Sequence, residues 1–445
     1  MWPLVVPACC WGATALGQTA ASAGGAPTAS ADAVWQEATR LEADGRFEEA
    51  AAQYGAIPTD SPDWQKAAVQ AGGCLEKAGK LAEAVARYDA VIARNPSAYW
   101  AELALLQKAR TCNAMANVAE ARRCIDRLKA RFPDSSSLAH ALLLQAQIDG
   151  RNTAAAEALV ARELEATALY RQAILADRKK DEAQAFELLD AAITRYPDTP
   201  AALRCRDARA HMLVRHRSPE ERTRAGTEFL YILTLVEDSA PNSRIAEIAR
   251  LRLAALHHSF RNRQDAIALY QGLLNSADKA IAGRAALQVA GLQFELMQRE
   301  KLSGAPPSDR RWEELRALCA GVAGSRDATV AQRVRAEVMA IESLAWQGRD
   351  AEALAAVEVF LSKYRDIALK QDVATVHFLA GVTARKLGDY NKALRHFGWV
   401  VTAYAGEKEI WPGMDHLPRA HKRYGRFCGA SRPRRSTSSK PLPFF

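Results

Sequence analysis

The chain has 445 residues, with only 25 glycines and 18 prolines. Its abundant alanine, leucine, glutamate and arginine favour helices, and the sparse glycine and proline argue against a fold of strands and tight turns. The formal net charge is +9, but removing the eight lysines and arginines of residues 418–445 from the total of 60 leaves 52 basic against 51 acidic residues. Because the rest of the chain carries almost no net charge, its overall electrostatic field is not expected to bind nucleic acid or an acidic membrane.

The first residues resemble a bacterial export signal followed by a spacer. An apolar run extends from Leu4 to Leu16, and Ala21-Ser22-Ala23 has the small-x-small pattern of a cleavage site. The run is too short and too interrupted to span a membrane. We expect a signal peptide at residues 1–23, a linker at 24–32, and a periplasmic or otherwise exported bacterial protein. No lysine or arginine precedes the run, so a cytoplasmic protein is the alternative.

Residues 33–198 repeat one helical pattern. Gly45 and Gly79 are 34 residues apart, as are Ala50 and Ala84, and a tyrosine follows each alanine by four residues. An alanine with apolar residues four and seven positions later marks one stripe of an α-helix. Prolines then end the helix; they are Pro62, Pro96, Pro133 and Pro197. The pattern therefore predicts an array of helical hairpins.

The pattern continues to residue 405 with interruptions. We expect degenerate helical repeats at 199–330, where residues 216–226 and 300–309 look like irregular connections, and clear repeats again at 331–405. A glycine, or Ala116 or Lys180 in its place, is expected to form the tight turn inside each hairpin. The alanines that centre the units are Ala50, Ala84, Ala121, Ala185, Ala266, Ala353 and Ala393.

The clearest copy is FLAGVTARKLGDYNKALRHFGWVV at residues 378–401, with Gly388, Ala393 and Phe397 at the expected steps. This pattern resembles the tetratricopeptide repeat (TPR), a helix–turn–helix unit of 34 residues, over roughly residues 31–405. The resemblance implies an all-α, right-handed solenoid of antiparallel helix–turn–helix repeats. One hairpin cannot bury its apolar face alone, so neighbouring hairpins must stack.

The resemblance also implies that a partner protein or peptide binds along the concave face, which the first helix of each repeat lines. In one TPR subset a lysine and an asparagine in that helix clamp a C-terminal carboxylate, and the corresponding positions here hold no such pair. Each candidate below also fits an ordinary solvated helix face. The polar residues expected nearest the groove are Glu76, Lys77, Arg110, Asn113, Asp177, Arg178, Arg385 and Lys386.

The sequence contains no recognisable catalytic, metal or cofactor motif. It has no G-x-S-x-G, H-E-x-x-H or phosphate-binding loop, and the adjacent His257 and His258 would point about 100° apart on a helix. No cysteine pair has C-x-x-C spacing. Cys112 and Cys124 fall on the two helices of one hairpin, where either a disulfide or two core thiols fit. We therefore expect no enzyme, no cofactor and no small-molecule substrate.

Residues 406–445 read as an irregular basic tail, because RPRRSTSSKPLPFF has no helical period. The expected function is a non-catalytic protein–protein interaction scaffold in the bacterial envelope. Two alternatives stay open: an array that serves an enzyme or a lost C-terminal domain, and a contact between the tail and nucleic acid or anionic lipid.

Overall fold

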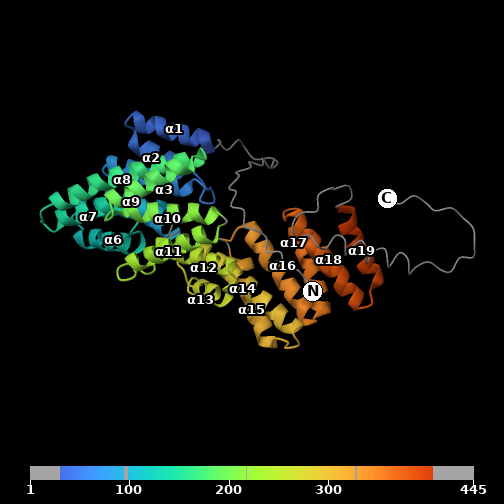
Figure 1. Ribbon diagram of the computed structural model, residues 1–445. Coiled ribbons are helices and arrows are strands. Elements are labelled where there is room, and N and C mark those ends of the chain that lie inside the picture. Colours follow the sequence, from blue (N-terminus) through green and yellow to red (C-terminus); the bar gives the residue numbers. More distant parts are fainter. Residues whose placement is uncertain (1–30, 95–98, 217, 326–327, 404–445) are drawn as a thin grey trace, which may run out of the picture. The chain divides into compact units, whose positions relative to one another are not determined.

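The computed structural model describes residues 31–403, apart from residues 95–98, 217 and 326–327. The described residues form 19 α-helices and no strand (Figure 1). The expected signal segment and the basic tail lie outside them. In chain order the helices are α1 (Ala31–Ala43), α2 (Phe47–Gly55), α3 (Trp64–Lys77), α4 (Leu81–Arg94), α5 (Tyr99–Ala114), α6 (Val118–Arg131), α7 (Ser136–Ile148), α8 (Ala154–Arg178), α9 (Glu182–Arg195), α10 (Pro200–Arg215), α11 (Pro219–Val236), α12 (Arg244–Ser259), α13 (Arg263–Gln271), α14 (Lys279–Leu302), α15 (Asp309–Gly324), α16 (Val330–Gln347), α17 (Asp350–Tyr364), α18 (Lys370–Lys386) and α19 (Tyr390–Ala403).

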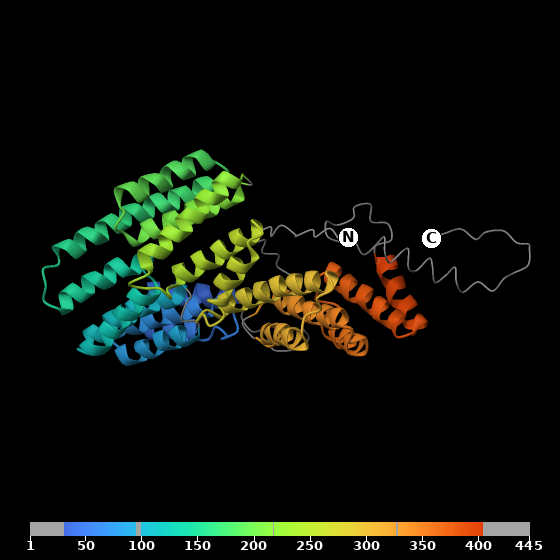
Figure 2. The same ribbon diagram turned by 60° about the horizontal axis from the view of Figure 1, so that its bottom comes forward.

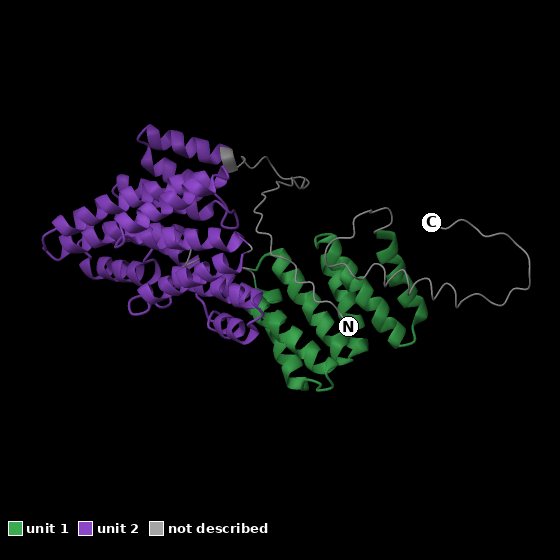
Figure 3. Ribbon diagram, in the orientation of Figure 1, with its two compact units in different colours: residues 1–20, 286–445 green, residues 21–285 purple. Residues whose placement is uncertain are grey.

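The chain divides into two compact units (Figure 3). Among the described residues, those up to 285 form unit 2 and those from 286 onward form unit 1, so the boundary lies within α14. Inside each unit, consecutive helices pack as antiparallel pairs that stack on their neighbours (Figures 1 and 2). In its described residues each unit is therefore an all-α stack of helix–turn–helix repeats, as the sequence predicts.

The repeat alanines are fully enclosed within the stack of helices. All seven have no exposed surface, because a methyl side chain lets two helices approach without a gap. The larger residue four positions later is buried as well, with at most 3% of its surface exposed. These larger residues are Tyr54, Tyr88, Ile125, Leu189, Tyr270, Val357 and Phe397.

The turns inside the hairpins use the left-handed backbone conformation. Gly388 has φ +82° between α18 and α19, and Ala116 and Lys180 have φ +58° and +63° at equivalent turns, as predicted. Beside Lys180, the Asp181 amide donates to the Ala176 carbonyl at 3.0 Å, which ends α8 in a Schellman-type turn. Arg261, with φ +66°, fills the same role between α12 and α13 without a predicted counterpart.

One expected irregular connection is wrong in part. Residues 216–226 were expected to be irregular, but α11 begins at Pro219. The Ser218 hydroxyl accepts a hydrogen bond from the Glu221 amide at 3.3 Å, and proline suits the first helical position because its missing N–H has no helical partner there. The second expected connection is partly a loop, because α14 extends to Leu302 and α15 begins at Asp309.

The first helices of the hairpins form a layer of their own within each unit. In unit 2, α3 contacts α5, α5 contacts α7, and α10 contacts both α7 and α8, whereas in unit 1 α16 contacts α18. The second helices pack beside this layer. Side chains from separate repeats consequently meet along the first-helix layer, where TPR-like arrays are expected to bind partners.

Candidate partner-binding face

The eight predicted groove residues all lie near the C-terminal ends of first helices. Glu76 and Lys77 end α3, Arg110 and Asn113 lie in the last turns of α5, Asp177 and Arg178 end α8, and Arg385 and Lys386 end α18. The structure brings together the α3 and α5 groups, which belong to adjacent helices of unit 2. The α18 group belongs to unit 1.

Four of the eight side chains tie successive repeats together. Lys77 pairs with Glu42 at 2.7 Å and Lys386 with Asp350 at 2.9 Å. Glu76 accepts a hydrogen bond from Thr111, and Asp177 pairs with Arg215. The partners in these contacts are 35 to 38 residues apart, or about one repeat. Exposed pairs of this kind contribute only about 0–1 kcal/mol each, so they set the register between repeats more than they stabilise it.

The other four side chains have no hydrogen bond or ion pair with another described residue. Arg110, Arg178 and Arg385 are exposed, and Asn113 is partly buried. Cationic side chains without an internal partner on the first-helix layer are available to a partner's carboxylates. Their role in binding remains a prediction.

A cluster of buried charges inside unit 2 was not predicted. Glu163 of α8 is only 1% exposed, and its carboxylate accepts hydrogen bonds from Arg204 Nη2 at 2.5 Å, the Ala201 amide at 2.8 Å and Thr167 Oγ1 at 2.9 Å. The Arg204 guanidinium also lies 5.5 Å from the centre of the Tyr170 ring. A buried carboxylate needs such partners, because an unpaired buried charge is costly.

Two further carboxyls lie near this cluster, one on another helix and one in a turn. Glu102 of α5 accepts a hydrogen bond from Ser135, and Asp134 lies in the turn between α6 and α7. Burial raises the pKa of Glu102 to about 7, and the nearby Asp134 raises it as well, while Ser135, Arg244 and Arg204 lower it. Burial likewise raises the pKa of Asp134. Of the two, Glu102 can therefore keep a proton near neutral pH.

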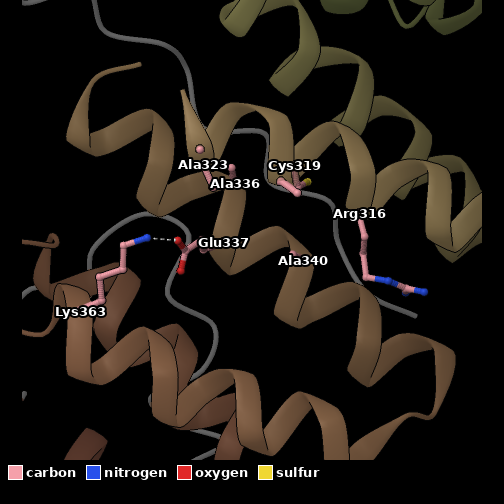
Figure 4. Close-up of a pocket in the computed structure, with 9 residues that line it drawn as sticks. Arg316, Cys319, Ala323, Ala336, Glu337, Ala340 and Lys363 are labelled. Carbon is pink, nitrogen blue, oxygen red and sulfur yellow. Dashed lines mark hydrogen bonds and ion pairs between the residues drawn. The ribbon is translucent and has the colours of Figure 1, made fainter. Parts of the chain in front are cut away.

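A pocket of about 430 Å³ lies in unit 1 between α15, α16 and α17 (Figure 4). Small residues line most of it: Cys319, Ala320, Ala323, Gly324, Ala336 and Ala340. At one end Lys363 pairs with Glu337 at 2.7 Å, and Arg316 lies at the other end (Figure 4). Arg316 donates to Gln347 at 2.8 Å. The pocket is large enough to hold a bulky apolar side chain, and polar residues lie at its two ends.

Metal-binding groups and reactive thiols were the chemical features to look for in the described part of the chain. No group of three or more His, Cys, Asp or Glu side chains there is arranged to hold a metal ion. Cys112 and Cys124 are buried free thiols rather than a disulfide. Burial raises the pKa of the Cys319 thiol in the pocket to about 12, so this thiol is not a nucleophile at neutral pH. Within residues 31–403, no described helix combines the length and apolarity needed to cross a membrane.

Comparison with protein families agrees with the repeat geometry. Two tetratricopeptide repeat models match, one over residues 75–148 and one over residues 167–199. These stretches contain hairpins with the buried alanine and the left-handed turn described above. The chain is a tetratricopeptide repeat protein. No curated protein matches this TPR chain.

Solved structures similar to this TPR protein include the TPR domain of P58(IPK), at 15% identity over 91% of this chain and 100% of that chain, with a TM-score of 0.27. Yeast Tom70 is 12% identical over 90% of this chain and 96% of that chain, with a TM-score of 0.29. A human IFIT1 dimer with PPP-AAAA is 16% identical over 83% and 82%, with a TM-score of 0.31.

Sequence reasoning located the repeats but missed the buried charge cluster. Glu102, Glu163 and Arg204 stand at helical positions that look like ordinary solvated faces in the sequence. One local signal existed, because the joints RFPDSSS and RYPDTPA place Asp134 and Asp198 after similar helix ends. Only the packing of α5, α8 and α10 shows which of these acidic residues is enclosed.

Proposed function

We propose that this TPR protein is a non-catalytic scaffold that binds a partner protein or peptide along the first-helix layer of unit 2. The observation that carries the proposal is the contact of α3, α5, α7, α8 and α10 in one layer. Such a layer presents side chains of several repeats to one extended partner. TPR proteins generally bind protein partners, which supports the same function.

The charges on this layer favour a partner with both acidic and basic groups. Arg110 and Arg178 offer exposed cations with no partner among the described residues, and Glu102 and Asp134 supply carboxyls on the inner side. Interfaces of mixed charge gain specificity and a faster association rate from complementary potentials. We expect salt to weaken partner binding moderately rather than abolish it.

We propose a bacterial envelope location on sequence grounds alone. The apolar run from Leu4 to Leu16 and the small residues at Ala21 and Ala23 support export. Fractionation of cells that produce the full chain, with N-terminal sequencing of the product, tests this proposal. A periplasmic product that begins near Gly24 is the expected outcome, and an intact cytoplasmic chain would contradict it.

Capture of partners by the full chain tests the scaffold function. Tagged protein is crosslinked in extracts, and mass spectrometry identifies both the retained protein and the crosslinked residues. Arg110→Glu reverses a charge on the first-helix layer, and Arg127→Glu makes the same change on the exposed face of the second helix α6. We expect Arg110→Glu to weaken capture at least tenfold and Arg127→Glu to leave it unchanged.

A third variant distinguishes the tail from the solenoid. It replaces the basic residues of 418–440 by glutamine in the otherwise complete chain. Capture of the same protein by this variant supports the scaffold. Binding that requires these residues, involves nucleic acid or anionic lipid, and falls steeply with salt would instead favour the tail as the functional element.

A further inference from the structure

The outward face of α11, the second helix of the α10–α11 hairpin, is an uncharged stripe. Its exposed residues between Ala225 and Val236 are Thr227, Leu230, Tyr231, Thr234 and Leu235, here called the α11 stripe. Leu230, Tyr231 and Leu235 are 54%, 45% and 47% exposed. These positions recur every three or four residues, so their side chains lie on one face of the helix. The opposite face of α11 packs on α10 and α12.

The two threonines of the α11 stripe are satisfied within their own helix. The Thr227 hydroxyl donates to the carbonyl oxygen of Thr223 at 3.2 Å, and the Thr234 hydroxyl donates to that of Leu230 at 3.1 Å. A hydroxyl that already has a hydrogen bond needs no new partner when water is removed from it. The stripe can therefore be buried against an apolar surface at little cost in free energy.

The equivalent faces of other second helices in unit 2 are charged. Thr227, Leu230 and Tyr231 stand two, five and six positions after the buried Ala225. The equivalent positions after Ala121 of α6 and Ala185 of α9 include the exposed residues Arg123, Asp126, Arg127, Glu187 and Asp190. Charged faces of this kind suit permanent contact with water, whereas a contiguous exposed apolar patch marks an interaction site.

Two arginines of α10 hold the centre of the α11 stripe in place. The Arg206 guanidinium lies 4.3 Å from the centre of the Tyr231 ring, and Arg206 and Arg209 both pair with Glu228 of α11. A tyrosine that is already held in one orientation loses little conformational freedom on binding. Tyr231 is therefore suited to anchor an interface, a position at which tyrosine is enriched.

Opposite charges stand at the two ends of the α11 stripe. Arg224 precedes it and Asp238 follows it; both are exposed, and neither side chain has an ion pair or hydrogen bond with another described residue. Glu237, after the last residue of α11, keeps helical backbone angles (φ −57°, ψ −47°). Arg224 and Asp238 are each seven residues from Tyr231, which places them within about 40° of each other around the helix.

We propose that the α11 stripe is a homodimer interface, in which the α11 helices of two copies of this chain pair antiparallel across a two-fold axis at Tyr231. The axis sets Arg224 of each copy opposite Asp238 of the other, so the unpaired charges are matched twice. It also sets Thr227 opposite Leu235, so that uncharged residues meet uncharged residues. A second copy of this chain thus fits both the apolar centre and the charged ends.

The size of the stripe sets the strength of the dimer. The distance from Arg224 to Asp238 along the helix is about 21 Å, which is short for a stable interface. We expect a reversible dimer with a Kd of about 10–100 μM. The contact uses a second helix, so the first-helix layer is not part of it.

Sedimentation velocity of the full chain, from 1 to 200 μM, tests for this dimer. We expect the wild type to shift from monomer to dimer as its concentration rises. Leu230→Glu places a charge inside the stripe and should weaken association at least tenfold. Leu164→Glu makes the same change on α8, where Leu164 is 59% exposed, and should leave association unchanged. Circular dichroism confirms that each variant keeps its helix content.

A charge exchange tests the antiparallel pairing itself. Arg224→Asp places two acidic residues at each charged contact of its own dimer, and Asp238→Arg places two basic residues there, so each variant alone should associate at least fivefold more weakly than the wild type. A mixture of the two variants restores opposite charges at both contacts. Fluorescence-detected sedimentation of labelled Arg224→Asp, titrated with unlabelled Asp238→Arg, should show a mixed dimer of nearly wild-type affinity.

Three results would overturn the proposal. One is a wild-type chain that stays monomeric up to 200 μM, which would leave the stripe to a different protein. Another is a dimer that Leu230→Glu does not weaken. The third is a mixture of Arg224→Asp and Asp238→Arg that associates no better than either variant alone. Because no partner protein is present in these measurements, none of the results bears on the scaffold function.

Discussion

At the scale of single residues, two adjacent glycines of α3 meet different surroundings. A Cβ on Gly72 would lie 2.7 Å from Cζ of the fully buried Tyr88, whereas a Cβ on Gly73 would meet nothing within 4 Å. We expect Gly72→Ala to destabilise unit 2 by about 1–3 kcal/mol, because the crossing of α3 and α4 would be overpacked. Gly73→Ala should instead stabilise α3 by about 0.5–1 kcal/mol through helix propensity. Urea unfolding followed by circular dichroism measures both, and equal shifts would contradict this packing.

The pair His377 and His396 gives the second prediction at this scale. Their Nδ1 atoms lie 2.9 Å apart, and the His377 ring stacks on Trp399 with ring centres 4.1 Å apart. Burial lowers the pKa of His377 from 6.5 to about 4, with the neighbouring His396 adding to the effect. Because the folded state disfavours the charged ring, stability is full above pH 6.5 and declines as the pH falls toward 4.

The His377 prediction is measured by proton NMR of the histidine rings and by the urea midpoint at pH 7.5 and pH 5. We expect the His377 signal to titrate well below that of the urea-unfolded chain, and the midpoint of unit 1 to be lower at pH 5. A His377 signal that titrates at 6.5 in the folded protein would refute the buried neutral pair.

At the scale of elements, the turn between α8 and α9 stores conformational strain. Lys180 has φ +63°, which a residue with a Cβ adopts at a cost, whereas Lys179 before it has φ −79°. We expect Lys180→Gly to stabilise the hairpin by about 1 kcal/mol and raise Tm, and Lys179→Gly to lower Tm, because only position 180 needs the left-handed region. Thermal unfolding of both variants provides the comparison.

At the scale of the whole molecule, a destabilising substitution in one unit should leave the stability of the other unit unchanged. Phe397 is fully buried in the unit 1 core and packs edge-on against Phe378, with ring centres 5.8 Å apart. We expect Phe397→Ala to cost about 3–5 kcal/mol and to speed amide hydrogen exchange in α16–α19. Exchange in α1–α6 should stay unchanged, since a stack of repeats transmits damage mainly to neighbouring repeats.

Hydrogen exchange with mass spectrometry tests this separation, with Tyr88→Ala as the counterpart in unit 2. Tyr88 is also fully buried, in a core that α1–α7 share. Faster exchange at both ends of the chain in either variant would show that the repeats unfold as one cooperative body.

The sequence by itself determined the repeating hairpin, its turns and its core. The alanine at the centre of each unit, the apolar residue four positions later and the residue at the tight turn are set by helix periodicity and backbone sterics. These are local properties, so Ala50, Ala393, Lys180 and Gly388 could be assigned without coordinates. The start of α11 was missed because the Ser218 cap and Pro219 were read as a loop signal.

Only the tertiary structure decided which polar residues work together. Lys77 and Lys386, which were predicted to lie near the groove, pair with acidic residues of the preceding repeat, and their role in binding stays a prediction. Arg131 and Glu247 meet across 116 residues. No sequence period predicts that contact, because it depends on how the curvature of each repeat accumulates along the stack. Charge pairing and burial depend on residues that are distant in the sequence. The position of a single residue in the chain therefore does not determine them.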